Sequence, residues 1–405
     1  MENISKPITL ECGLTLPNRL VKAAMAENLA GQNSLPNSKH LLAAYNKWSQ
    51  GGWGLVLTGN VMVDSAYRGI SCDVVIDSSI PKEKVISAWK GWAEACSMNG
   101  TKAIVQLNHS GRQTPWRTGI APSAIPLDFG RGILPYIVNT LVFGTPREMS
   151  IEDIQNVVQM FREAACLAAE AGFAGIEIHA AHGYLLASFL SPISNHRTDA
   201  YGGSESGRAR IVVEVIRAIR VAVPPSFCVG IKLNSGDHQS DSSMSQCISQ
   251  ISSIIEAGVD FLEISGGTFE NPSFSTGSTA SDAAQHPQKN GREGFFLDFA
   301  SAIRAKFPRV PLIVTGGFRT RRAMEAAVRD SSCDMIGLAR PAVMNPSLPK
   351  DIILNSQVQV QHAVACVKAI EESRFSKWAG IKAIGVGAET GWYTKRIYEL
   401  GDQLP

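Results

Sequence analysis

Two histidines and a tyrosine stand close together in the stretch Gly175–Arg210. His179 ends a short apolar run, His182 follows three residues later, and Tyr184 comes two residues after that. Because both imidazoles come from one turn, they can point into one pocket. There, two N–H donors on one oxygen would polarise a carbonyl or nitro group. The phenol of Tyr184 could supply a proton to the same substrate from another direction.

A zinc pair, or two histidines capping a turn, is the competing interpretation. A zinc site needs at least a third protein ligand, and Glu177 on the same strand face is the nearby candidate. The eight cysteines are scattered without a C-x-x-C pair. This pattern disfavours a disulfide framework and a cysteine-ligated metal or iron–sulfur site, so we expect reduced, mostly buried thiols and no metal.

The elements that position these residues follow a repeating order. Eight apolar runs predict strands, at Leu20–Met25, Leu55–Thr58, Lys102–Leu107, Gly175–His179, Cys228–Leu233, Phe261–Ser265, Leu312–Thr315 and Asp334–Leu338. Helical patterns lie between them, at 39–50, 82–98, 151–172, 205–222, 242–257, 295–306 and 320–329. Strand and helix repeated without hairpins predict parallel pairing, and eight units indicate a closed (β/α)8 TIM barrel. Its active site would lie at the C-terminal strand ends.

Three segments depart from this order. Residues 108–149 and 266–294 are rich in Gly, Pro, Ser and polar residues, so we expect long catalytic-face loops that shape the substrate pocket. Residues 351–405 favour a C-terminal helical extension packed on the barrel, with a Gly-rich break before a final short helix. The predicted domains are therefore a barrel at 1–350 and this extension at 351–405. No strand is followed by G-x-G-x-x-G, which argues against a Rossmann dinucleotide site.

Charge and hydropathy limit the class of partner. The chain has 38 basic and 36 acidic residues, for a net charge of +2, spread without a basic stripe. We therefore expect small-molecule partners rather than nucleic acid or a membrane surface. No apolar run has the length of a signal peptide core or a membrane span, so we expect a soluble, cytoplasmic protein. A second copy of the chain, in a homo-oligomer, is also a possible partner.

The string H-A-A-H-G-Y-L-L, followed by F-L-S-P-x-S-N-H-R-T-D-x-Y-G-G, resembles the old yellow enzyme family, in particular its fungal-type members. LPNRLVKAAMA, VQLNHSGR and DMIGLAR resemble the family's first, third and eighth strands. The resemblance covers roughly residues 5 to 350 in the right order. Each matching piece falls at the barrel position that the strand pattern predicts.

The resemblance implies a non-covalent FMN across the strand ends. Residues bordering it would be Ala24, Met25, Ala26, Gly59, Ser265 and Gly266. The amide of Gln106 would face the pyrimidine edge, where donors and acceptors alternate. Lys232 would lie near N1 and the C2 carbonyl, where a cation stabilises the anionic reduced ring.

The phosphate would lie after the seventh and eighth strands, the usual phosphate position in barrels. Gly316 and Gly317 follow the seventh strand, and Ala339 and Arg340 follow the eighth. The family's reaction has two halves. NAD(P)H reduces the flavin, and the flavin then passes hydride from N5 to the β-carbon of an electron-poor C=C bond, such as that of an enone or enal. His179 and His182 would hold the activating oxygen, and Tyr184 would protonate the α-carbon.

The chain also departs from the family. Ala26 stands where many members have Thr or Cys, and Lys232 replaces the more usual Arg, which loses the bidentate fork. Larger relatives carry an iron–sulfur cluster in addition to the barrel. We do not expect this chain to have that architecture, because it lacks the clustered cysteines that would hold the cluster. A biosynthetic isomerase or dehydrogenase on the same barrel stays open as an alternative. A flavin-binding protein without catalysis has no need of the histidine pair and the tyrosine.

Overall fold

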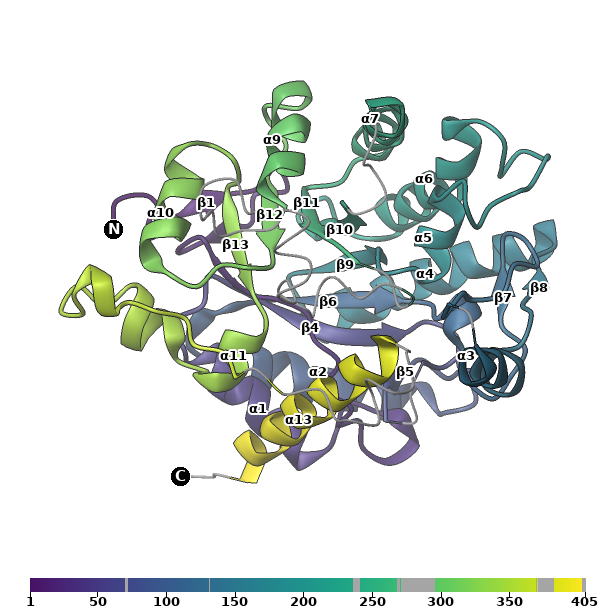
Figure 1. The fold of residues 1–405 in the computed structure, drawn as a ribbon. Coiled ribbons are helices and arrows are strands. Elements are labelled where there is room, and N and C mark those ends of the chain that lie inside the picture. The colour runs from purple at the N-terminus through teal and green to yellow at the C-terminus, as the bar shows by residue number, and fades with distance from the viewer. Residues whose placement is uncertain are drawn as a thin grey trace.

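The computed structural model describes residues 1–69, 72–130, 132–235, 241–267, 270, 296–368, 370 and 382–402. Within them, eight parallel strands close into a barrel (Figure 1): β3 Leu20–Lys22, β4 Leu55–Met62, β6 Lys102–Asn108, β9 Gly175–Ala180, β10 Cys228–Asn234, β11 Phe261–Ser265, β12 Leu312–Thr315 and β13 Met335–Leu338. The last strand pairs with the first, Gly337 beside Val21, which closes the ring. The predicted TIM barrel is confirmed.

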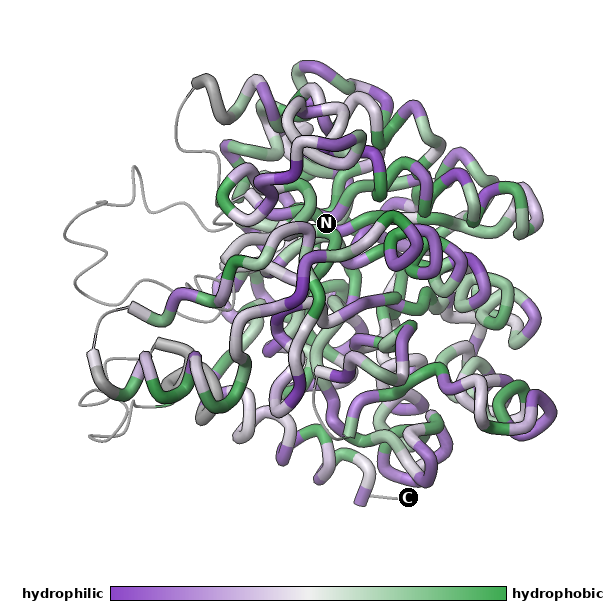
Figure 2. Tube along the Cα trace, turned by 90° about the vertical axis from the view of Figure 1, so that its right-hand side faces the viewer, coloured by the Kyte–Doolittle hydropathy of each residue, from purple (hydrophilic) through white to green (hydrophobic). Residues whose placement is uncertain are grey.

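Helices cover the outside of the barrel. They are α1 Lys39–Ser49, α2 Lys82–Cys96, α4 Ile151–Ala171, α6 Glu205–Ala222, α7 Asp241–Glu256, α9 Leu297–Lys306, α10 Arg321–Arg329 and the short α11 Arg340–Met344. The first seven start and end within two residues of the predicted segments. In Figure 2 the helices alternate between hydrophobic and hydrophilic colours along each turn, as expected when one face packs on the strands.

Helix α4 shows why local sequence was enough to place these helices. The Ser150 side chain accepts from the backbone N–H of Asp153, and the Asp153 carboxylate accepts from the backbone N–H of Ser150. This reciprocal cap satisfies two donors that the first turn leaves free. At the other end Gly172 adopts φ 96°, a left-handed conformation that favours glycine. The face bearing Phe161 is buried against the strands.

A hairpin that the sequence did not predict closes the N-terminal end of the barrel. Strands β1 Ile8–Thr9 and β2 Thr15–Leu16 pair antiparallel. Leu10 and Leu16 are buried in one cluster with residues of the barrel strands, among them Phe261. Strands of two residues are too short to show an alternating pattern, which is why this element was missed.

The two predicted loops had different outcomes. Segment 108–149 contains β7 Ile120–Ala121 and β8 Arg147–Glu148, paired in parallel, and the short helix α3 Ile133–Val138. Segment 266–294 lies almost wholly outside the described residues. A further short helix that was not predicted, α5 Leu185–Leu190, begins directly after Tyr184.

The last of the described segments is one continuous helix, α13 Lys382–Asp402. The predicted Gly-rich break is wrong, because those glycines lie inside this helix. The helix lies along α1 (Figure 1). The Tyr398 and His40 rings stack between the two helices, with centroids 3.8 Å apart. A Cβ at Gly401 would stand 2.6 Å from the His40 Cα, so the two backbones approach too closely for a larger residue. None of the described helices is long and apolar enough to cross a membrane.

Candidate active site

Two adjoining cavities open at the C-terminal ends of the barrel strands. The larger, of about 250 Å³, has the histidine pair, Tyr184 and Gln106 in its wall. The smaller, of about 120 Å³, is bordered by Gly316 and Gly317. The two share Ala24, His182, Lys232, Ala339 and Arg340. Of the site residues predicted from the sequence, all but Gly59 and Gly266 line one of these cavities.

The histidine pair forms a short chain of hydrogen bonds. The backbone N–H of Ala181 donates to His179 Nδ1 at 3.2 Å, so the proton of a neutral His179 lies on Nε2. That nitrogen lies 3.2 Å from His182 Nδ1, and His182 Nε2 lies 3.1 Å from the Ser265 hydroxyl. Burial, reinforced by the charge of Lys232, lowers the pKa of both imidazoles well below the usual value. Both rings are therefore neutral near pH 7.

The backbone of His182 is held in an unusual conformation. Its φ is 58°, in the left-handed region that residues other than glycine seldom adopt. Gln113 fixes this turn by donating from Nε2 to the His182 carbonyl at 2.8 Å. Strained backbone of this kind persists where surrounding contacts determine it, and it is frequent at active sites.

Tyr184 approaches the pair from the side. Its ring packs edge-on to His179, with centroids 4.9 Å apart. Asn60 Nδ2 lies 3.4 Å from its hydroxyl. Burial, followed by the charge of Asp73, raises the pKa of the phenol well above the usual value, so Tyr184 carries its proton throughout the physiological range. Asn60 also lines the cavity, and nothing in its sequence context indicated this.

A buried group of charges lies beneath the larger cavity. Lys232 Nζ is 2.8 Å from Glu263 Oε1, and the two side chains are 4% and 0% exposed. Gln106 Nε2 donates to Glu177 Oε2 at 2.5 Å. Burial, with the nearby charge of Glu263, raises the pKa of Glu177 well above normal. We therefore describe Glu177 as a neutral carboxyl that orients Gln106.

The smaller cavity has features of a phosphate site. Gly316 and Gly317 adopt φ values of 131° and 84°, which favour glycine and turn the backbone after β12. Arg340 follows β13 and lines both cavities. Its guanidinium pairs with Glu389 of α13 at 2.7 Å.

Gly59 and Gly266, the two predicted residues that line neither cavity, make close packing contacts. The Gly59 N–H donates to Glu27 Oε1 at 2.9 Å, and a Cβ there would meet Glu27 Oε2 at 1.9 Å. A Cβ on Gly266 would meet the Phe296 ring at 2.4 Å. The absence of a Cβ thus leaves room for the Glu27 carboxylate at Gly59 and for the Phe296 ring at Gly266.

The C-terminal helix α13 supplies a wall that sequence reasoning missed. The residues concerned are Glu389, Thr390, Tyr393, Thr394 and Ile397, most of them at helical spacing on one face. Their spacing alone could have indicated a buried stripe, but not which surface would cover it.

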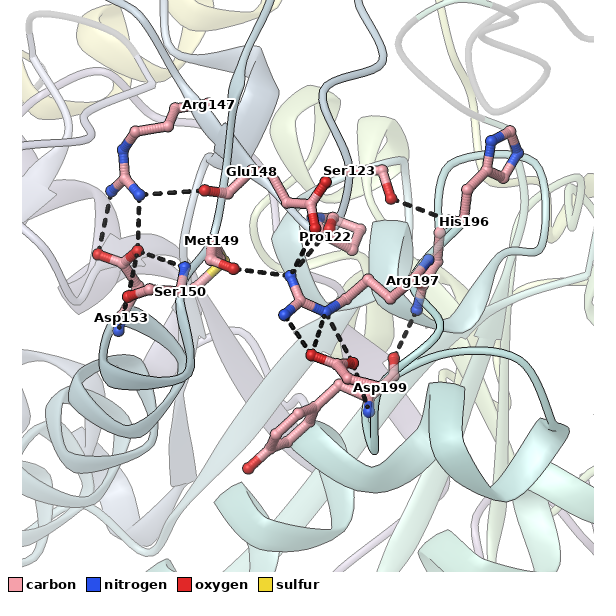
Figure 3. A network of polar contacts seen from close by, with 12 residues as sticks. Pro122, Ser123, Arg147, Glu148, Met149, Ser150, Asp153, His196, Arg197 and Asp199 are labelled. Carbon is pink, nitrogen blue, oxygen red and sulfur yellow. Dashed lines mark hydrogen bonds and ion pairs between the residues drawn. The ribbon is translucent and has the colours of Figure 1, made fainter.

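Part of the recognised string holds the loops rather than the chemistry. Arg197 donates to the carbonyls of Pro122 and Met149 at 3.0 and 2.7 Å and pairs with Asp199 (Figure 3). Figure 3 also shows Arg147 pairing with Asp153, the capping residue of α4. These contacts tie segment 108–149 to the loop after α5.

A zinc site at the histidine pair would need a third ligand, and the described residues place no His, Cys or carboxylate with His179 and His182 in such a group. The group of three possible ligand atoms that they contain is Cys12, Cys228 and Asp260. It lies away from the residues of both cavities.

Comparison with known proteins shows the family of this chain. Residues 3–358 match the model of the NADH:flavin oxidoreductase / NADH oxidase family. The chain belongs to this family. It is 49% identical to an NADH-dependent flavin oxidoreductase of Neonectria sp. (strain DH2), over 96% of this chain and 53% of that protein. It is 47% identical to one of Talaromyces variabilis, over 98% of both chains. The chain thus spans about half the length of the Neonectria relative.

Solved structures of the flavin oxidoreductase family share the fold. Morphinone reductase in complex with tetrahydroNAD has a TM-score of 0.67 and 24% identity, covering 86% of this chain and 90% of that one. The old yellow enzyme homologue from Zymomonas mobilis has a TM-score of 0.71 and 22% identity, covering 88% and 94%. The resemblance to old yellow enzyme is confirmed.

Family membership implies FMN, with NAD(P)H as reductant, and the site fits that cofactor. A buried cation, Lys232, lies under the larger cavity, and the glycine turn with Arg340 borders the smaller one. The Asn60 Oδ1 is buried without a hydrogen-bond partner at the cavity wall. Gln106 keeps a second N–H and its carbonyl oxygen for the pyrimidine edge.

Proposed function

We propose that this chain is an FMN-dependent NAD(P)H oxidoreductase that reduces electron-poor C=C bonds, such as those of enones and enals. The observation that supports this most is the placement of two neutral imidazoles and a protonated phenol around one cavity. FMN bound there would take hydride from NAD(P)H and deliver it from N5 to the alkene.

His179 and His182 would bind the activating oxygen of the substrate. The Nε2 proton of His179 is available at the 3.2 Å gap between the rings. His182 becomes a second donor when its proton moves to Nδ1, and its Nε2 then accepts from the Ser265 hydroxyl 3.1 Å away. A hydroxyl suits both tautomers because it can donate or accept. Two N–H groups would then meet one carbonyl or nitro oxygen and stabilise the negative charge that develops on it.

Tyr184 would supply the proton. Its raised pKa keeps the hydroxyl protonated, which an acid catalyst requires. Asn60 lies within 3.4 Å and can hold the hydroxyl in place. Lys232, buried with Glu263, would place positive charge where the reduced ring becomes anionic.

The test is anaerobic NADH titration of the FMN-loaded protein with and without 2-cyclohexenone. We expect the flavin to bleach with NADH and to recover its absorbance when the enone is added. Each of His179→Ala and His182→Ala should keep FMN bound and slow recovery about 100- to 1000-fold. Tyr184→Phe should slow it about 100- to 10,000-fold.

His196→Ala serves as the matched control, because this histidine is exposed and lies outside both cavities. It should behave as the unaltered protein does. Enone reduction that survives in the double variant His179→Ala/His182→Ala would refute the assignment. Substrate rearrangement without consumption of NADH would replace it with an isomerase.

A further inference from the structure

Two thiols that are far apart in the sequence meet at the N-terminal end of the barrel. Cys12 lies in the turn of the β1–β2 hairpin, and Cys228 is the first residue of β10. Their sulfur atoms and a carboxylate oxygen of Asp260 all lie within 4.8 Å of one another. The proposed reduction has no use for this group, because the substrate cavity is at the other end of the strands.

The two thiols differ in exposure. Cys12 is half-buried and lines a surface cavity of about 370 Å³, which Arg220 and Asp260 also border. Cys228 has no exposed surface. A small oxidant arriving from solvent therefore reaches the sulfur of Cys12 first.

The contacts around Cys12 favour its thiolate. The Cys228 thiol and the backbone of Leu14 hydrogen-bond to its sulfur, and the Arg220 guanidinium adds positive charge. Together they lower the pKa of Cys12, against the opposing effects of burial and Asp260. Burial, by contrast, raises the pKa of Cys228 well above normal, so this residue keeps its proton. A thiolate of lowered pKa with access to solvent, next to a second thiol, is the usual arrangement of a redox-active cysteine.

Arg220 makes this group a poor metal site. Its Nη2 lies 2.6 Å from Asp260 Oδ2, and the backbone N–H of Val229 donates to the same oxygen at 2.7 Å. Arg220 also donates to the carbonyls of Gly258 and Phe227 at 2.6 and 2.9 Å, which fixes its charge there. A divalent cation would have to bind next to this guanidinium and compete for a carboxylate already engaged.

We propose that Cys12 and Cys228 form a reversible intramolecular disulfide when the protein meets a peroxide. The Cys12 thiolate attacks one oxygen of hydrogen peroxide, giving a sulfenic acid and hydroxide, which takes up a proton as water. The Cys228 sulfur then attacks the Cys12 sulfur. The S–S bond forms, the sulfenic hydroxyl leaves, and the Cys228 proton converts it to a second water. Two thiols are oxidised and one peroxide is reduced, and an external dithiol reverses the bond.

The disulfide would bring the hairpin turn closer to β10. A disulfide requires the sulfurs to close to about 2.05 Å. Gly13, next to Cys12, adopts φ 87° at the turn, and no heavy atom lies within 4 Å of the position its Cβ would take. Gly13 is therefore not packed against other atoms on its Cβ side, and the two sulfur atoms start no more than 4.8 Å apart. The bond would fix the hairpin over the barrel end that Leu10 and Leu16 already cover.

The experiment treats the FMN-loaded full chain with hydrogen peroxide and maps its tryptic peptides without reduction. Cys12 is the only cysteine in the peptide ending at Arg19, and Cys228 is the only one in residues 221–232. We expect these two peptides to appear linked, with the loss of two hydrogens, and to separate after dithiothreitol. FMN absorbance should be retained throughout, because the cofactor site is at the other end of the barrel.

Two variants assign the roles. With Cys228→Ala, dimedone should trap a sulfenic acid on Cys12, and alkylation of Cys12 by iodoacetamide near pH 7 should slow about tenfold, as expected when the thiol that donates to its sulfur is removed. Cys366→Ser is the matched control, because this cysteine is exposed and should leave the linked pair unchanged. Oxidation of Cys12 beyond the sulfenic acid without linkage, or its capture by glutathione alone, would overturn the proposal. Protection of both thiols by Zn²⁺ at micromolar concentration would overturn it in favour of a metal site.

Discussion

Replacing Lys232 by Met would leave Glu263 buried without its counter-ion. The two groups are 2.8 Å apart and almost fully enclosed. Burial alone would lower the pKa of Lys232 and raise that of Glu263, but their mutual attraction reverses both shifts. Removing one partner from such a pair typically costs about 3–5 kcal/mol. Unfolding entropy is about 2.1 cal/mol/K per residue, so over 405 residues this loss corresponds to a Tm about 4–6 °C lower.

The stability lost in Lys232→Met should depend on pH. In the unaltered protein the folded pKa of Glu263 is lowered, so its stabilising contribution is present above the unfolded pKa and is lost as pH falls through the folded value. In Lys232→Met the opposing charge is gone, and burial raises the folded pKa of Glu263 instead. The folded variant then holds a proton that the unfolded chain releases, so its stability falls as pH rises from the unfolded pKa towards the folded one. The difference between the two proteins should therefore widen as the pH rises above the unfolded pKa of a glutamate, about 4.3.

Thermal unfolding across this pH range tests the prediction. It should be run with a fixed excess of FMN and again without FMN, because cofactor binding itself adds stability. The double variant Lys232→Met/Glu263→Gln should recover most of the loss, and Lys232→Arg, which keeps the charge, should lose less. A Lys232→Met deficit that is equal at every pH, or a double variant no more stable than the single one, would refute the reasoning.

Three further outcomes are expected. Ser265→Ala should slow enone reduction roughly tenfold or less, the equivalent of one hydrogen bond of about 0.5–1.5 kcal/mol, whereas Ser265→Thr keeps the hydroxyl and most of the rate. Equal rates of stopped-flow flavin reoxidation in Ser265→Ala and the unaltered protein would contradict the role proposed for this hydroxyl. Gly59→Ala should cost about 1–3 kcal/mol or more in urea unfolding, because its Cβ would stand 1.9 Å from Glu27 Oε2; unchanged stability would show that this region relaxes freely. Glu389→Gln should tighten FMN binding, measured by fluorescence titration, because it removes a carboxylate that competes with the phosphate for Arg340. Weaker binding in this variant would mean that the ion pair supports the site.

The barrel could be predicted because its evidence is local. Each strand is a short apolar run and each helix has its own period and caps, as α4 shows with Ser150 and Gly172. Since parallel strands of a barrel end at one mouth, residues at or just after the strand ends, such as His179, Lys232 and Arg340, could be assigned to one site before any contact was known. The family resemblance added the cofactor.

Contacts between distant segments were decided by the tertiary structure. Nothing near Arg340 indicates Glu389, nothing near Cys12 indicates Cys228, and the carboxyl that orients Gln106 lies on another strand. The sequence by itself thus determined which residues form each element and which strand ends carry polar groups, because periodicity and capping act over a few residues. Which of those groups touch was decided only by the tertiary structure. Such contacts depend on strand register, on closure of the barrel and on where the terminal helix packs, and none of these leaves a local pattern in the sequence.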